Sequence, residues 1–457
     1  MGKTLPPIRR AWLLPLVLAL ALADFWAAPA EAQGRRLIRD AEIESIIRDF
    51  ATPLFQAAGL NPQAIDVYLI EDKSLNAFVA GGQNLFIHTG LLINTEDPLE
   101  LIGVIAHETG HIAGGHIASR IEELENTQTK VLASYILGLG AAIATGQPGL
   151  AVAIISGGQD IALKGLLSYS RSQEQAADQA AVKYLNATGQ SPRGLLDFMR
   201  LLGDQEMLLA SSQDPYIRTH PLTRERVAFL EEQTRLSPNR DTPTRPDFVA
   251  LHKRMRAKLV GFLEPLERVF RKYPESDTSL EARYARSIAH YRRPDLKKAL
   301  PLIDGLIEER PDDPFFHELR GQMLFENGRI AEAVPEYESA VRLRPDSSQL
   351  TLALARAQIE MNDPRLNQEA LTHLQKTLDQ EPNNAGAWRL AAIAHGRMGD
   401  TGMTALSLAE AALARKEAPE ARDQSKRAQQ ILPEGSPGWL RAQDIQNLAE
   451  QIEKRDN

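Results

Sequence analysis

The residues most clearly suited to chemistry are His107-Glu108-Thr109-Gly110-His111, an HExxH pattern that closes the apolar run 99–106. On an α-helix the two histidines lie one turn apart and about 40° around the axis, so both imidazoles can bind one ion while Glu108 points at its open position. Catalytic zinc lowers the pKa of bound water to about 7, and Glu108 would then act as the general base. The pattern therefore predicts a zinc site.

The helix that carries this pattern has a clear start, with Asp97 placed as N-cap, Pro98 as first residue and Glu100 three residues after the cap. The alternative is a buried helix with this spacing by chance, but two histidines and a glutamate in so apolar a run carry a large burial cost unless something binds them. His116 does not extend the motif, because the longer HExxHxxGxxH pattern needs histidine where Ile117 stands. We expect His116 to cap the helix, to support a ligand from behind or to be solvated.

A peptidase zinc site needs a third protein ligand, and residues 170–185 offer one. Ser170 opens a predicted helix that ends before Gly189. Glu174 and Asp178 share a face four residues apart, so Glu174 could bind zinc while Asp178 accepts the free N–H of a ligating histidine. The flanking alanines would allow close packing against the HExxH helix. The alternative is a solvated acidic pair near a helix start, where the dipole favours acids.

Three motifs stand in a fixed order: HExxH, SRxxExxAD at 170–178, and Thr219-His220-Pro221-Leu222-Thr223-Arg224-Glu225-Arg226. From about Ile38 to Glu232 the chain resembles the HExxH zinc peptidases that include HtpX, the CAAX prenyl endopeptidases and the BepA/YfgC-type periplasmic proteins. The resemblance implies one zinc ion per chain, with Glu108 as base and Asp178 as support. It implies three ligands: His107, His111 and Glu174.

The third motif also brings His220 and Arg226 to the cleft, by the same resemblance. By its chemistry, His220 could donate to the developing oxyanion or cap the metal in a resting state. Arg226 could stabilise negative charge or brace the site. A Thr-His-Pro turn followed by a surface arginine is also an ordinary way to begin a helix, so both alternatives stay open.

Three strands are predicted before the zinc helix, at residues 66–70, 76–80 and 84–88. A strand beside that helix could bind an extended peptide at a free edge, mainly through backbone hydrogen bonds and therefore with loose side-chain selectivity. The resemblance favours Ala77-Phe78-Val79-Ala80 as this edge. The alternative is a fully paired structural hairpin.

The first 32 residues have the pattern of a secretory signal. Basic residues precede the apolar stretch 11–22, and Ala30-Glu31-Ala32 matches a cleavage site. We expect cleavage after Ala32 and a periplasmic mature protein; the alternative is an uncleaved anchor, although about a dozen apolar residues is short for a membrane span. The chain has no cysteine and therefore no disulfide. Its net charge of −8 and the lack of a basic run argue against nucleic-acid partners.

Residues 131–159 contain no charged side chain and form two apolar halves split by Gly146-Gln147-Pro148-Gly149. Each half is too short to span a bilayer comfortably. We expect a helical hairpin that covers the active site or makes a peripheral membrane contact. A buried core hairpin is the equally weighted alternative.

A polar, proline-bearing segment at 237–246 predicts a linker between a zinc metallopeptidase domain at 33–236 and a second domain at 247–435. In the second domain a proline recurs at 37, 34 and 37 residues, close to the tetratricopeptide period: Pro274, Pro311, Pro345 and Pro382. About four helix pairs would stack into a curved protein-binding surface, against the alternative of a simple helical extension. Residues 436–457 would form a C-terminal helix or tail.

These patterns together predict a mainly α fold with a small β-sheet, in which an HExxH zinc-peptidase domain precedes an α-solenoid of tetratricopeptide repeats. The predicted function is an exported zinc endopeptidase. The BepA/YfgC-type resemblance implies misfolded or misassembled outer-membrane proteins as substrates, docking of the repeats to the outer-membrane assembly machinery, and chaperone-like activity. The alternative is a repeat-containing scaffold or chaperone with a latent or structural zinc site. Glu108 argues against it, because a structural site has no use for a base.

Overall fold

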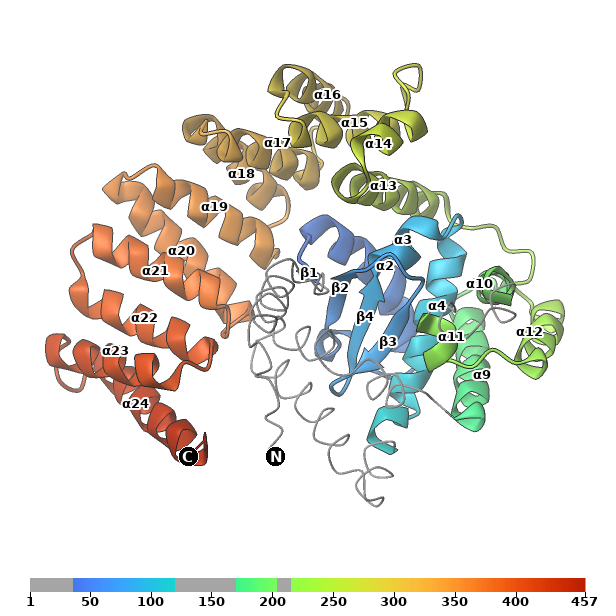
Figure 1. Cartoon of the computed structure of the whole chain (residues 1–457), viewed down its shortest axis with the longest axis horizontal. Coiled ribbons are helices and arrows are strands. Elements are labelled where there is room, and N and C mark those ends of the chain that lie inside the picture. The colour runs from blue at the N-terminus through green and yellow to red at the C-terminus, as the bar shows by residue number, and fades with distance from the viewer. Residues whose placement is uncertain (1–35, 120–169, 204–214, 457) are drawn as a thin grey trace, which may run out of the picture.

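The computed structural model describes residues 36–119, 170–203 and 215–456. Two regions follow one another along the chain (Figure 1). The N-terminal region, residues 36–236, combines a small sheet with helices. The repeat region, residues 246–456, contains helices alone in the secondary structure described. The predicted fold class, mainly α with a small sheet and helical repeats, is confirmed.

The sheet has four strands in the order β1-β2-β4-β3. Strand β2 runs parallel to β4, whereas β1 pairs with β2 and β3 pairs with β4 in antiparallel fashion. The three predicted strands are confirmed, and β1 is a short addition that pairs outside β2. Their bounds are β1 (Arg36–Ile38), β2 (Val67–Glu71), β3 (Ala77–Ala80) and β4 (Asn84–His88).

Helices cover this sheet and build the hydrophobic core against it. Helix α2 packs on β2 and on α4, α4 packs on β3, and α9 and α10 pack on the far side of α4. The core includes Phe50, Phe86 and Ile102, all fully buried. The helices are α2 (Ala41–Ala57), α3 (Thr89–Asn94), α4 (Pro98–Ala113), α9 (Arg171–Ala187), α10 (Arg193–Gly203), α11 (Pro215–Thr219) and α12 (Arg224–Leu236), with a 3-10 turn η2 (Pro62–Ala64).

The two helices predicted to carry the site begin where their capping residues stand. Asp97 accepts a hydrogen bond from the Leu99 N–H at 2.8 Å, and Pro98 is the first residue of α4. Ser170 caps α9, where its side chain and that of Gln173 form a capping box. Because these caps satisfy backbone N–H groups that the helix itself leaves free, they fix where each helix starts.

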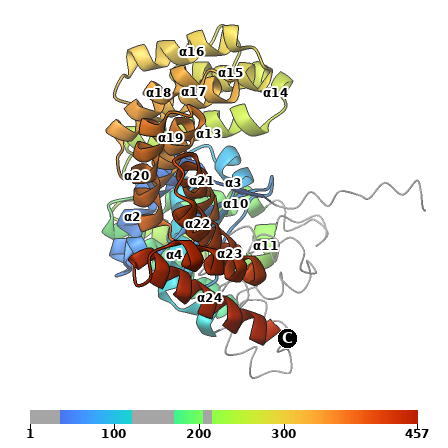
Figure 2. The same ribbon diagram turned by 90° about the vertical axis from the view of Figure 1, so that its left-hand side faces the viewer.

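The repeat region stacks helix pairs into an arc that curls around the sheet (Figure 1), and the turned view shows the same stack from α16 down to α24 (Figure 2). The predicted prolines Pro311, Pro345 and Pro382 lie between successive pairs. The helices are α13 (Pro246–Leu263), α14 (Leu266–Lys272), α15 (Leu280–Arg292), α16 (Leu296–Glu309), α17 (Pro314–Glu326), α18 (Ile330–Leu343), α19 (Ser348–Glu360), α20 (Pro364–Gln380), α21 (Ala385–Arg397), α22 (Thr401–Ala414), α23 (Ala418–Ile431) and α24 (Pro437–Asp456).

Small residues let these pairs pack closely. In α17, a Cβ added at Gly321 would lie 3.0 Å from the ring of Tyr337 on α18. The aromatic ring thus occupies the space that the glycine leaves, which is the packing expected of small residues in stacked helix pairs.

Two predicted features, the signal segment 1–32 and the apolar segment 131–159, lie outside the described residues. Within the part of the chain that the structure describes, every helix is too short or too polar to span a bilayer.

Candidate metal centre

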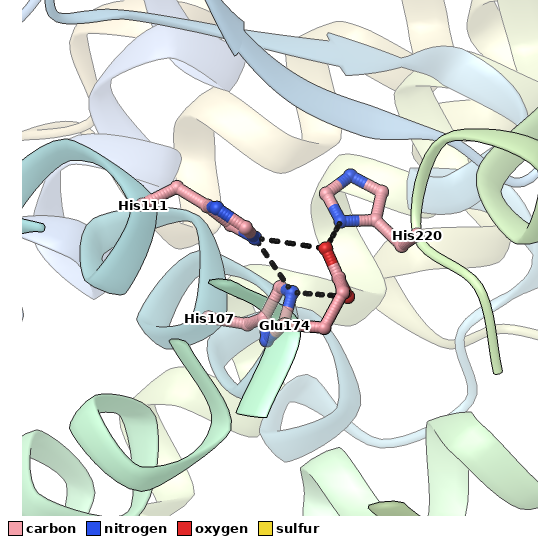
Figure 3. A group of neighbouring side chains, drawn as sticks. All are labelled: His107, His111, Glu174 and His220. Atoms are coloured by element: carbon pink, nitrogen blue, oxygen red, sulfur yellow. Dashed lines mark hydrogen bonds and ion pairs between the residues drawn. The ribbon is translucent and has the colours of Figure 1, made fainter. Parts of the chain in front are cut away.

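The five HExxH residues lie in the last two turns of α4, and all five are buried. His107, Glu108 and His111 are all fully buried. Glu174 on α9 and His220, just after α11, are buried beside them. Figure 3 shows the three histidines and Glu174 converging on one point from α4, α9 and the segment that follows α11.

The distances between nitrogen and oxygen atoms are those of a ligand set. His107 Nε2 and His111 Nε2 lie 3.1 Å apart. Glu174 Oε2 lies 3.4 Å from His107 Nε2, and its Oε1 lies 3.3 Å from His111 Nε2. His220 Nδ1 adds a contact of 3.1 Å to Glu174 Oε1. One ligand atom from each of the four residues falls within 4.8 Å of the others.

These residues fit a metal ion of the size of Zn²⁺. Tetrahedral ligands at 2.0–2.2 Å from an ion lie about 3.3–3.6 Å from each other, close to the separations found here. Imidazole nitrogen and carboxylate oxygen are also common zinc donors. Among the described residues neither carboxylate oxygen of Glu108 has a hydrogen-bond partner, although His220 Nε2 lies 3.4 Å from its Oε1. Burying a carboxylate without hydrogen-bond partners is energetically costly, and a metal-associated water would supply the missing partner.

Glycine brings α4 and α9 together. A Cβ added at Gly110 would lie 2.9 Å from the backbone oxygen of Ala177 and 3.2 Å from the Cβ of Ala180. The α4 backbone therefore approaches α9 as closely as sterics allow, with small residues on both sides. This approach places Glu174, one turn before Ala177, opposite His111, and confirms the close packing expected from the alanines of α9.

Asp178 and Arg226 stand behind the side chains of His107 and Glu174. Asp178 Oδ1 lies 2.9 Å from His107 Nδ1, on the side of the ring away from Glu174. Arg226, only 1% exposed, holds Asp178 through two hydrogen bonds of 2.7 and 2.9 Å and lies 2.6 Å from Glu174 Oε2. The guanidinium thereby fixes both carboxylates at once.

Burial and these ion pairs set the protonation of the cluster. Burial disfavours the charged form of His107, but Asp178 and Glu174 outweigh it and raise the pKa of His107 to about 9. Burial lowers the pKa of His111 well below its usual value and raises the pKa of Glu108. The pKa of Glu174 is well below its usual range, because His220 and Arg226 overcome the effect of burial. The metal-free cluster therefore keeps a proton on His107 that a metal ion would displace.

His220 packs on Tyr216, a residue that was not predicted from the sequence. The ring of Tyr216 in α11 stacks on that of His220, with centroids 4.4 Å apart and an interplanar angle of 20°. The backbone N–H of His220 also donates to Tyr216 O at 2.7 Å. Their spacing of four residues, one helical turn, is the signal that could have pointed to Tyr216.

The remaining predicted residues also come near the centre. His116 Nδ1 lies 2.9 Å from His111 Nδ1 and therefore stands behind the ring of His111, which is one of the three alternatives expected for it. The segment Ala77–Ala80 forms β3, the last strand of the sheet on the side that packs on α4. All four side chains of β3 are buried.

Comparison with known proteins agrees with this geometry. Residues 37–234 match peptidase family M48, and residues 284–348 and 318–366 match the tetratricopeptide repeat. The chain is 25% identical to the putative beta-barrel assembly-enhancing protease of Vibrio cholerae over 80% of this chain and 75% of that protein. It is 25% identical to the beta-barrel assembly-enhancing protease of Yersinia pestis (83% and 77% covered) and 23% identical to that of Escherichia coli (79% and 74%).

The fold and the buried histidine-glutamate cluster define a metalloendopeptidase with an appended helical repeat region. Its N-terminal region is a peptidase family M48 domain, and tetratricopeptide repeats follow it.

Proposed function

We propose that this protein is a zinc-dependent endopeptidase that cleaves misfolded or misassembled proteins of the bacterial envelope. The observation that carries the proposal is the convergence of His107, His111 and Glu174, with mutual distances of 3.1–3.4 Å, beside the buried carboxylate of Glu108. Structural zinc sites use four protein ligands and close the ion off from solvent, whereas a catalytic site keeps a position for water.

In this proposal His107, His111 and Glu174 hold one Zn²⁺ and Glu108 is the general base. Zinc, when bound, polarises the scissile carbonyl and acidifies water. Glu108 takes the proton of the attacking water and later passes it to the leaving amine. Burial, which raises the pKa of Glu108, brings that carboxyl closer to the pH at which it must exchange a proton. Asp178 orients His107, and Arg226 keeps Asp178 and Glu174 ionised and in place.

His220 we assign to the resting state. Its Nδ1 lies 3.1 Å from Glu174 and its Nε2 lies 3.4 Å from Glu108, so its ring stands where substrate and water would enter. Removing it by His220→Ala should raise peptidase activity while zinc content stays near one per chain. Unchanged or reduced cleavage would instead favour a role in oxyanion stabilisation.

The substrate would lie along β3. This strand ends the strand order beside α4, so an extended peptide added there would run past the HExxH helix. Backbone pairing of this kind gives loose selectivity, which suits an enzyme for unfolded chains.

The substrates, the docking partner and the cellular compartment are proposed from the relatives and from the sequence. The similar proteins bear the name beta-barrel assembly-enhancing protease, which supports substrates among outer-membrane proteins and docking of the repeats to their assembly machinery. A signal peptide at 1–32 would deliver the chain to the periplasm. The corresponding division is a peptidase domain at 33–236, a linker at 237–246, repeats at 247–435 and a terminal helix or tail at 436–457; α12 ends at Leu236 and α13 begins at Pro246.

The test compares purified wild type with Glu108→Gln and Glu174→Ala on casein and on an unfolded outer-membrane protein, with and without a chelator. We expect Glu108→Gln to keep zinc and lose cleavage, and Glu174→Ala to lose both. The exposed carboxylate variant Glu232→Gln on α12 serves as the matched control and should cleave normally. Stoichiometric zinc in Glu174→Ala would contradict the ligand assignment.

The second candidate is a scaffold or chaperone with a latent zinc site, which the long helical repeat region favours. The same samples separate the two. If zinc binds, client proteins still bind, and wild type cleaves no more than Glu108→Gln on any unfolded substrate, the scaffold function replaces the enzyme.

A further inference from the structure

Two glycines directly after α4 bring a third histidine, His116, next to the HExxH motif. Helix α4 ends at Ala113, and Gly115 adopts a φ of 62°, a left-handed conformation that glycine tolerates. After this turn, His116 Nδ1 lies 2.9 Å from His111 Nδ1, with the two ring centroids 5.0 Å apart. His116 is 8% exposed, so this contact is largely shielded from water.

The turn makes room for this ring. A Cβ added at Gly114 would lie 2.5 Å from His116 Nε2 and 2.9 Å from its Cε1. No side chain larger than hydrogen fits at Gly114 while His116 keeps its position. The two glycines therefore contribute differently: Gly115 adopts the left-handed conformation of the turn, and Gly114 leaves the space in which the ring of His116 lies.

We propose that His116 is a positioning residue that fixes the tautomer and orientation of His111; this inference rests on the proposed zinc site. A neutral imidazole has one N–H and one acceptor nitrogen. For His111 Nε2 to bind an ion, its proton must be on Nδ1, and that proton must then be donated across the 2.9 Å contact. His116 Nδ1 accepts it and carries its own proton on Nε2.

The geometry excludes His116 as a ligand of the same ion. His116 contacts the Nδ1 side of His111, whereas Glu174 lies on the Nε2 side at 3.3 Å. The two nitrogens of an imidazole point away from each other, so an ion held at Nε2 is out of reach of His116.

The two histidines of the motif thus have different supports. His107 faces the carboxylate of Asp178 at 2.9 Å, and His111 faces a neutral imidazole. The buried centre already holds the carboxylates of Glu108, Glu174 and Asp178 with Arg226 as counter-charge. An uncharged acceptor at 116 orients His111 without adding another buried negative charge, which would itself need compensation.

The test uses His116→Asn and His116→Leu, two side chains of nearly equal size. The Asn amide oxygen can accept a hydrogen bond close to where the His116 Nδ1 lies, and Leu cannot. Zinc affinity of the full-length protein, measured by competition with a chromophoric chelator, should fall about 10- to 100-fold in His116→Leu. It should recover most of that loss in His116→Asn. The visible absorption of the Co²⁺-substituted protein should change in the Leu variant and stay near wild type in the Asn variant.

Circular dichroism of the metal-free proteins shows whether each variant is folded. If His116→Leu does not fold, Gly114→Ala displaces the same ring through its clash with Nε2 and should weaken zinc binding in the same range. Wild-type zinc affinity in the folded Leu variant, or Asn binding as weakly as Leu, overturns the positioning role. Either result leaves the proposed function intact if wild type binds zinc and cleaves, whereas a wild type that binds no zinc removes the proposed function itself.

Discussion

Replacing Gly110 with alanine tests how closely α4 must approach α9. The added Cβ would lie 2.9 Å from Ala177 O, 3.0 Å from Ala177 Cα and 3.2 Å from Ala180 Cβ, whereas ordinary contacts begin at 3.4 Å. The nearest two atoms belong to backbone, so no rotamer change relieves the clash. The helices must separate by about 0.5 Å to restore normal contact.

Two effects on stability oppose each other in this variant. Overpacking a buried contact costs about 1–3 kcal/mol. Alanine in place of glycine inside a helix stabilises the folded state by about 1 kcal/mol. We therefore expect the free energy of unfolding of metal-free Gly110→Ala to fall by about 0–2 kcal/mol, a modest change.

The effect on the metal centre should be larger than the effect on stability. His111 directly follows Gly110, and Glu174 precedes Ala177 by one turn, so separation of the helices lengthens the 3.3 Å distance between His111 and Glu174. A displacement of 1 Å in a catalytic site can cost about a hundredfold in rate, so half of that corresponds to about tenfold. We expect peptidase activity to fall by about tenfold, with weaker zinc binding.

The matched control is Gly305→Ala in the middle of α16, where an added Cβ meets only Arg283 Nη1 at 4.0 Å. Urea denaturation and chelator competition would be measured on both variants. Gly305→Ala should gain stability and keep normal zinc affinity. If Gly110→Ala behaves in the same way, with unchanged zinc affinity and activity, the close approach of α4 and α9 does not set the metal geometry.

Two further predictions concern buried groups. Burial and the charge of Arg256 lower the pKa of His252 to about 3. As the pH falls, the unfolded chain therefore binds this proton before the folded protein does. The free energy of unfolding that is present above about pH 6.5 is lost towards pH 3. Between pH 7 and pH 5 this group alone should lower the free energy of unfolding by about 2 kcal/mol, and urea titrations of His252→Asn should lack that part of the loss; an equal loss in both proteins would contradict the assignment. Arg226→Met should destabilise the metal-free protein by about 3–5 kcal/mol, because Asp178 and Glu174 stay buried without their cation, and zinc should reduce the loss. Denaturation with and without zinc checks this, and an identical loss in both conditions would count against it.

The parts of the fold that were predicted correctly depend on local signals. Helix α4 begins after Asp97 and α9 after Ser170, because capping groups sit next to the residues whose N–H groups they satisfy. The three longer strands follow from short apolar runs bounded by turn residues. Strand β1 is only three residues long and pairs with residues more than thirty positions away, so no local pattern marks it.

The same distinction applies to the candidate site. His107, His111 and Glu174 could be named together from helix periodicity and the order of motifs, and the structure places them within 3.4 Å of one another. The contact of His116 could not be assigned in advance, because it depends on the φ angle of Gly115. The stacking of Tyr216 on His220 had a local signal in their four-residue spacing, but that spacing has meaning only once the short helix α11 is known to form.

The repeats and the HExxH helix α4 both pack on α2, and buried charges hold the two regions in one orientation. Glu42 at the start of α2 accepts a hydrogen bond from Tyr284 of α15 at 2.6 Å and pairs with Arg254 and Lys258 of α13. Lys258 is 2% exposed and lies 2.8 Å from Asp40. Rotating the repeats away would leave these charges buried without partners or expose the apolar groups around them, a loss of several kcal/mol. If the repeats bind a client, as proposed, they would hold it in a fixed orientation relative to the HExxH helix, because α2 also packs directly on α4.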